Sequence, residues 1–111
     1  MNSYDRGDVV LVRYHGVEED SHLRPALVVS SETYQQGRQQ LVLAAITGRH
    51  TSLQPGDTSV QAWQSAGLLA PSVVTGVLFT VTPDVVERRL GSLGAENLHA
   101  VEQSLRVCLG L

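Results

Sequence analysis

The sequence has no lysine, one cysteine and few aromatic residues, and these shortages limit what the protein can be. With Cys108 alone, no intrachain disulfide can form, and this cysteine usage suits a reducing cytoplasm. All 8 basic residues are arginines, while 11 acidic residues give a formal net charge of −3. Proteins that coat nucleic acid are usually basic. Any contact with nucleic acid must therefore come from a local patch of arginines.

Common catalytic and targeting motifs are also absent. The sequence has no phosphate-binding loop, no GxGxxG fingerprint and no nucleophile elbow. No apolar run is long enough to cross a bilayer, and the polar start MNSYDRGD is unlike a signal peptide. The four histidines lack the paired spacing of a helical metal site; they are His15, His22, His50 and His99. We therefore expect a cytoplasmic protein that needs neither a metal ion nor a cofactor and does not bind membranes.

What the sequence does contain is a series of short apolar segments and one amphipathic helix. The 111 residues are 42% hydrophobic but only 5% aromatic, which predicts one domain over residues 1–111 with a core of valine, leucine and alanine. Apolar runs bounded by glycine, proline and polar residues predict strands; they span residues 8–14, 25–30, 41–47, 58–62 and 71–81. Residues 15–23 are polar and predict a loop, residues 31–40 predict a short helical turn, and residues 85–93 are ambiguous.

The clearest single element is a helix over residues 95–109. An apolar stripe at helical spacing predicts which side packs on the core; it comprises Leu98, Val101, Leu105 and Cys108. Gly94 is expected to cap the start and Gly110 to end the helix. Several strands followed by one terminal helix predict the α+β class, a mostly antiparallel small β-barrel with a helix against it.

Two polar residues stand at the ends of predicted strands. Arg24 precedes the second strand and Thr47 ends the third. An arginine can bind two phosphate oxygens at once and stabilise charge that grows in a transition state. In RNA the 2′-hydroxyl can attack the neighbouring phosphorus, so the protein has only to position the chain, stabilise charge and move protons. The alternative is that Arg24 is a solvated arginine whose stem packs on Pro25.

The order of the segments is more specific than any one residue. It comprises RGDVVLV at 6–12, RPALVVS at 24–30, LVLAAIT at 41–47, GD at 56–57, AGLLAPSVV at 66–74 and RRLGSL at 88–93. Together they resemble the MazF/PemK-like toxin family of bacterial type II toxin–antitoxin systems. The resemblance implies an SH3-like barrel with a C-terminal helix, the toxin fold shared with CcdB-like proteins. It further implies a homodimer, a cognate antitoxin, and metal-independent cleavage of single-stranded RNA at short sequences. The implied products are a 2′,3′-cyclic phosphate and a 5′-hydroxyl.

The resemblance also assigns roles to residues. Arg24 matches the family's transition-state stabiliser or acid, and Thr47 matches its phosphate-positioning partner. The loop that follows the first strand matches a variable loop that gates the RNA groove. Candidates there for acid, base or RNA contact are His15, Glu18, Glu19, Asp20 and His22. Further candidates for RNA binding are Arg13, Arg49 and His50.

One segment departs from the family pattern. Relatives often carry a basic and then an acidic residue soon after Pro-Ser-x-Val, whereas residues 75–78 are uncharged here. The general base is therefore unassigned. The alternative function is a non-catalytic protein of the same fold, which poisons a protein target or binds only an antitoxin or DNA. The presence of both Arg24 and Thr47 favours the nuclease.

Overall fold

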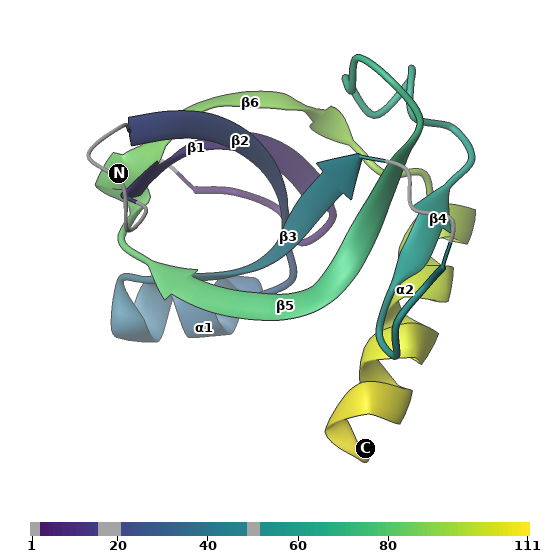
Figure 1. Cartoon of the computed structure of the whole chain (residues 1–111). Coiled ribbons are helices and arrows are strands. Elements are labelled where there is room, and N and C mark those ends of the chain that lie inside the picture. The colour runs from purple at the N-terminus through teal and green to yellow at the C-terminus, as the bar shows by residue number, and fades with distance from the viewer. Residues whose placement is uncertain (1–2, 16–20, 49–51) are drawn as a thin grey trace.

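The computed structural model describes residues 3–15, 21–48 and 52–111 of the chain. These residues form one antiparallel sheet with the strand order β4-β5-β3-β2-β1-β6. The elements are β1 (Asp8–His15), β2 (Ser21–Val28), α1 (Glu32–Arg38), β3 (Leu41–Gly48), β4 (Thr58–Val60), β5 (Ser72–Val81), the 3-10 turn η1 (Pro83–Val85), β6 (Val86–Ser92) and α2 (Ala95–Leu109). The sheet curls strongly but keeps β4 and β6 as edges (Figure 1). The α+β class is confirmed, although the sheet of the described residues is not a closed barrel.

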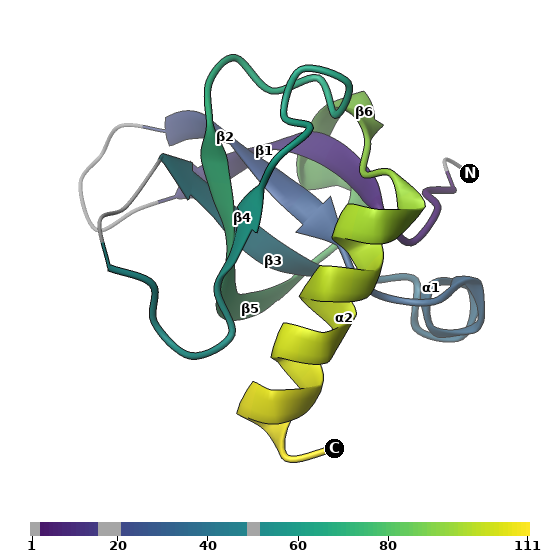
Figure 2. The ribbon, with the colours of Figure 1, turned by 90° about the vertical axis from the view of Figure 1, so that its right-hand side faces the viewer.

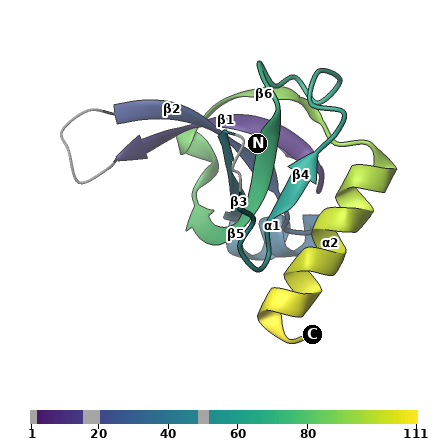
Figure 3. The same ribbon diagram turned by 45° about the vertical axis from the view of Figure 1, so that its right-hand side comes forward.

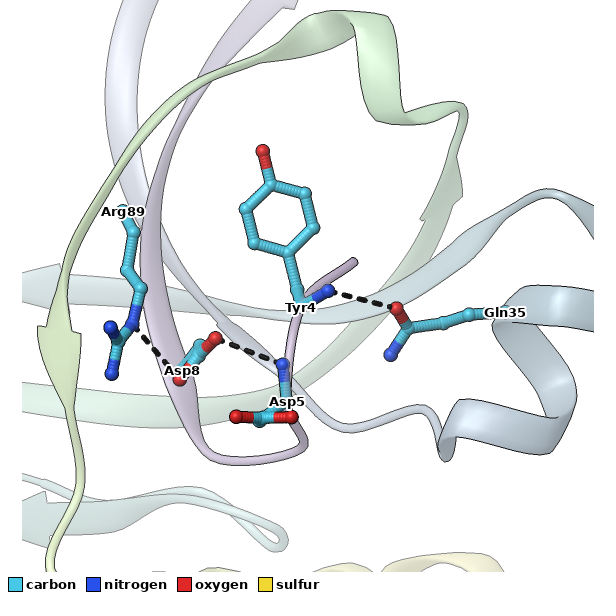
Figure 4. Close-up of polar contacts among 5 residues, drawn as sticks. All are labelled: Tyr4, Asp5, Asp8, Gln35 and Arg89. Atoms are coloured by element: carbon cyan, nitrogen blue, oxygen red, sulfur yellow. Dashed lines mark hydrogen bonds and ion pairs between the residues drawn. The ribbon is translucent and has the colours of Figure 1, made fainter. Parts of the chain in front are cut away.

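Both faces of the sheet are buried. Along β1 the side chains alternate, so that Val9 packs on the face covered by α2, while Val10 and Val12 pack inside the curl. Val101 of α2 is the helix residue buried in the first cluster. Tyr4 packs against the second cluster and lies inside the curl (Figure 4). Burial on both faces explains why the central strands are nearly continuous apolar runs.

Helix α2 has the bounds that the sequence predicted. Gly94 is its N-cap, and Gly110 ends it in the left-handed conformation with φ 73°. The prediction that Cys108 belongs to the buried stripe is wrong, because Cys108 is exposed. The last turn of α2 runs past the sheet, as Figure 2 shows, so the packed part of the stripe ends at Leu105.

The prediction of a loop over residues 15–23 is also wrong in part. Strand β2 begins at Ser21, and its pairing with β1 runs from His15 opposite Ser21 to Val9 opposite Leu27. Beyond the other strands this pair projects as a two-stranded ribbon (Figure 3). Residues 15–23 resembled a loop because they contain no run of apolar residues.

The ambiguous segment before α2 is strand β6. Its register against β1 shifts between Val9 and Val10 and again between Leu11 and Val12. Each shift places an extra residue in the strand and interrupts the alternation of the side chains. The sequence pattern of β6 therefore follows neither a strand nor a helix over its full length.

A buried carboxylate fixes the N-terminal segment against β6. The side chain of Asp8 is 6% exposed, and its Oδ2 accepts a hydrogen bond of 2.9 Å from the Asp5 backbone N–H. Its Oδ1 lies 3.1 Å from Nε of Arg89 (Figure 4). Nearby, the side-chain oxygen of Gln35 on α1 accepts a hydrogen bond from the Tyr4 N–H. These contacts join α1, β1 and β6 around the open side of the curl.

The segment between β4 and β5 contacts β6 through backbone atoms. Gly67 has φ +82°, and a Cβ at this residue would collide with the carbonyl of Leu90. A Cβ on Gly91 would lie 2.6 Å from the carbonyl oxygen of Ala66. Only glycine permits an approach this close at both residues.

We expect Gly67→Ala to lower the free energy of unfolding by about 2 kcal/mol or more, because it adds a left-handed alanine and a backbone collision. The matched control is Gly37→Ala in α1, where a Cβ would meet nothing within 4 Å. That change is expected to stabilise the protein by about 0.5–1 kcal/mol. Urea unfolding measures both, and equal stabilities of the two variants would contradict the expectation.

Candidate active site

The site begins where β2 and β3 stop pairing. The two strands pair at Val28 with Leu43, Leu27 with Ala44 and Ala26 with Ala45. Two residues further in the same register, Arg24 would face Thr47, but the pairing of the described residues ends at Ala26. Pro25 has no N–H with which to continue it. Beyond this residue β2 pairs only with β1 in the described part of the chain, so a gap opens between β2 and β3.

A cavity of about 460 Å³ lies at this gap. The polar side chains that line it come from four strands: Arg24 from β2, Thr47 from β3, Ser72 from β5 and Arg88 from β6. The rest of the lining is apolar or glycine: Leu11, Leu23, Pro25, Ile46, Gly48, Gly67, Leu68, Leu69, Ala70 and Leu90. Among the described residues, no carboxylate belongs to this lining. The structure therefore brings Arg24 and Thr47 to one cavity.

The cavity carries positive charge on a protein that is acidic as a whole. Three other arginines are neutralised by ion pairs of 3.1–3.2 Å: Arg6 with Glu102, Arg13 with Glu87, and Arg89 with Asp8. Arg24 and Arg88, by contrast, make no ion pair with the residues that the structure describes. Two uncompensated guanidinium groups attract an anion, above all one with paired oxygens such as a phosphate.

One wall of the cavity is an exposed apolar loop. Leu69 is 98% exposed, next to the buried Leu68. The hydroxyl of Ser72 donates a hydrogen bond of 2.8 Å to the carbonyl of Ala70, and the close approach at Gly67 fixes the other end of the loop. An apolar wall beside two guanidinium groups matches the two parts of a nucleotide, the base and the phosphate.

The other predicted residues that the structure describes are not among those that line the cavity. Arg13 is exposed on β1, and its Nη2 lies 3.2 Å from Oε1 of Glu87. His15 and His22 lie in the ribbon of β1 and β2, where His22 is opposite Tyr14, but only their backbone is described. The remaining candidates lie outside the described residues: Glu18, Glu19, Asp20, Arg49 and His50.

The uncharged segment of residues 75–78 has a structural role. Thr75 is buried, and its hydroxyl donates a hydrogen bond of 2.7 Å to the carbonyl of Ala45. The same oxygen accepts a bond of 3.2 Å from the Val77 N–H. These bonds lie where the register between β3 and β5 shifts, between Ala44 and Ile46. Thr75 therefore satisfies backbone groups at an irregularity of the sheet.

Sequence reasoning missed Arg88. The only indication in the sequence was the pair Arg88-Arg89 before Leu90. Because the register of β6 shifts twice, the sequence pattern does not show which of the two arginines lies on which face of the sheet. Among the described residues no three His, Cys, Asp or Glu side chains come together as a metal site would require. No helix in the described ranges is long and apolar enough to cross a membrane.

The fold is a small curled antiparallel sheet with a C-terminal helix, and two arginines line its cavity. Comparison with family models identifies the family. Residues 5–109 match the PemK-like, MazF-like toxin of type II toxin–antitoxin systems, and the chain belongs to this family. The resemblance inferred from the sequence segments is thereby confirmed. The comparison with curated proteins gives no match.

Solved structures share the fold over almost the whole chain. An endoribonuclease in complex with its cognate antitoxin from a mycobacterial species has 18% identity and a TM-score of 0.77, covering 98% of this chain and 97% of that chain. A MazE–MazF structure from Deinococcus radiodurans has 20% identity and a TM-score of 0.78, covering 97% and 96%. Mycobacterium tuberculosis toxin MazF-mt6 has 21% identity and a TM-score of 0.73, covering 94% and 97%. At these identities the likeness establishes the fold.

We expect Arg24→Gln and Arg88→Gln to leave the free energy of unfolding within about 0.5 kcal/mol of the unaltered protein, since neither arginine pairs with a described residue. Asp8→Asn should cost about 1.5 kcal/mol or more, because it removes charged hydrogen bonds of a buried carboxylate. Thermal or urea unfolding of the three variants measures this. A large loss for either arginine variant would show that its guanidinium supports the fold.

Proposed function

We propose that this protein is a sequence-specific endoribonuclease toxin that cleaves single-stranded RNA without a metal ion. The observation that carries the proposal is the cavity at the end of the β2–β3 pairing. It joins Arg24, Thr47 and Arg88, and no described residue of its lining is a carboxylate that would repel a phosphodiester. Membership of the toxin family supports the same function.

The chemistry that suits these residues is transesterification by the RNA itself. The 2′-oxygen attacks the adjacent phosphorus after losing its proton to a base, and the bond from phosphorus to the 5′-oxygen breaks. The 5′-oxygen takes up a proton, which leaves a 2′,3′-cyclic phosphate and a 5′-hydroxyl. The guanidinium of Arg24 stabilises the charge on the phosphate oxygens, or supplies the proton to the leaving oxygen. The Thr47 hydroxyl donates a hydrogen bond that positions the phosphate.

The base comes, on this proposal, from the ribbon of β1 and β2 or the segment that joins them. Leu23 of this ribbon lines the cavity beside Arg24, and the candidate bases lie within the next residues of the chain; they are His15, Glu18, Glu19, Asp20 and His22. The segment of residues 75–78 offers no alternative, because it is uncharged.

We infer a cognate antitoxin as partner and the cytoplasm as the place of action. The mycobacterial endoribonuclease of the same fold was solved with its cognate antitoxin, and the Deinococcus structure contains MazE with MazF. A segment that binds the groove with acidic side chains would pair with Arg24 and Arg88 and exclude RNA. Because the toxin has a net negative charge, an acidic segment can be attracted only to a local group of arginines.

A second candidate is a binding protein of the same fold that cleaves nothing. The role of Thr75 favours it, because that part of β5 supports the sheet and supplies no acid or base. The two candidates differ in one measurable property, which is the cleavage of RNA by the purified protein.

We expect the purified protein to cleave single-stranded RNA in the presence of EDTA and to leave 5′-hydroxyl ends. Arg24→Ala should lower the rate by about 10²–10³-fold or more, because it removes the charge that stabilises the transition state. Sequencing of RNA 5′-hydroxyl ends after induction of the toxin tests cleavage and gives the cut sequence. Arg38→Ala on α1, remote from the cavity lining, is the control and should cleave normally.

Intact RNA over many sequences, with a folded protein, would exclude the nuclease and favour the binding protein. A different result is full activity in Arg24→Ala together with loss of activity in Thr47→Val. It would show that another arginine of the groove stabilises the charge on the phosphate.

We also expect a homodimer in solution. Large apolar side chains are exposed on β5 and on the end of α2, namely Val77, Val107, Leu109 and Leu111. Contact with a second copy would remove this surface from water. Light scattering at micromolar concentration measures the mass, and a monomer mass would contradict the expectation. Val107→Glu should shift the mass towards the monomer.

A further inference from the structure

Two neighbouring arginines of β6 belong to different sides of the sheet. In the register with β1, Arg89 lies opposite Val10 and Arg88 lies opposite Leu11. Opposite residues of antiparallel strands share a face. Arg89 accordingly lies on the face of Val10, where it contacts Asp8 (Figure 4). Arg88 lies on the face of Leu11, and both residues line the cavity.

The register shifts on either side hold this pair of arginines in place. One shift leaves Leu90 and the other leaves Glu87 as extra residues of β6. The carboxylate of Glu87, the acidic residue nearest Arg88 in the strand, is bound to Arg13 at 3.2 Å. The two neighbours of Arg88 in the strand, Glu87 and Arg89, each form an ion pair with a residue of β1. Arg88 forms no ion pair with a described residue, so its charge is available to a ligand in the cavity.

Arg88 and Arg24 line the cavity from two strands, β6 and β2, that are separated by β1. Leu11 pairs with Arg88 on one side and with Pro25 on the other, so the three form one row across β6, β1 and β2. Two strand spacings separate the backbone of Arg88 from that of Pro25 by roughly 10 Å. Arg24 lies opposite Val12 in the register with β1, so it belongs to the other face of the sheet from Pro25 and Arg88 and lines the cavity where β2 and β3 part. The two guanidinium groups therefore suit two successive points of a polyanion better than one phosphate.

We propose that Arg88 is a positioning residue that binds an RNA phosphate other than the scissile one. The inference depends on the proposed function, since it assigns Arg24 and Thr47 to the scissile phosphate. Arg88 contributes to the binding of the substrate and to its salt dependence, and it leaves the bond-breaking step to Arg24. A guanidinium bound to the non-reacting part of the backbone lowers KM without raising kcat.

The test uses a short RNA that contains the mapped cut sequence, in one form with a 2′-deoxy sugar at the cut site that blocks cleavage. Fluorescence anisotropy gives Kd at several salt concentrations, and single-turnover cleavage of the unmodified RNA gives the rate constant at saturation. Arg88→Gln should raise Kd about tenfold and lower the slope of log Kd against log salt by about 0.7, one phosphate contact on a single strand. The saturating rate constant should stay within about threefold of that of the unaltered protein.

Two matched variants distinguish the effect of the charge on Arg88 from the effect of the total charge of the protein. Arg38→Gln removes the same charge from α1 and should leave both Kd and the slope unchanged. Arg88→Lys keeps the charge and should restore the slope, with Kd within about threefold of that of the unaltered protein. Urea unfolding confirms that each variant is folded before binding is compared.

Unchanged Kd and slope in Arg88→Gln, with an unaltered protein that binds and cleaves, would overturn the inference alone. A fall of the saturating rate constant by more than about tenfold would also overturn it, because Arg88 would then act on the scissile phosphate. If the unaltered protein neither binds nor cleaves RNA of any tested sequence, the proposed function fails, and the inference fails with it.

Discussion

The early end of the pairing between β2 and β3 is the constraint on which the rest of the structure depends. Pro25 lacks the N–H that would continue the ladder, and the pairing stops at Ala26. If the ladder continued, Arg24 and Thr47 would lie opposite each other in a closed sheet with no space for a ligand. Because it stops, their strands part, and a cavity of about 460 Å³ takes the place of two further paired residues. The strand that carries Arg24 remains ordered, since β1 pairs with it beyond this point.

The distribution of carboxylates decides where the positive charge of this acidic protein acts. Asp8, Glu87 and Glu102 each neutralise an arginine away from the cavity lining. Among the described residues, the lining of the cavity holds two arginines and no acidic residue. A local anion site can thus exist on a chain with a formal net charge of −3.

Irregularities of the sheet serve the site as well as the fold. The shifts in β6 assign Arg89 to the buried carboxylate of Asp8 and Arg88 to the cavity. The shift between β3 and β5 is satisfied by Thr75, which occupies a segment where relatives often place charged residues. The close approach of Gly67 to β6 fixes the apolar wall. The irregular positions of the sheet therefore determine which side chains line the cavity.

The sequence by itself determined the elements whose signals are local. Helix α2 has its own apolar stripe and two glycine caps, and the apolar runs of β1, β3 and β5 predicted those strands near their observed bounds. The ordered segments also determined the family. Tertiary structure alone decided the extension of β2, the nature of β6 and the place of Arg88. These depend on pairing between distant segments and on register shifts, and neither leaves a periodic pattern in the residues involved.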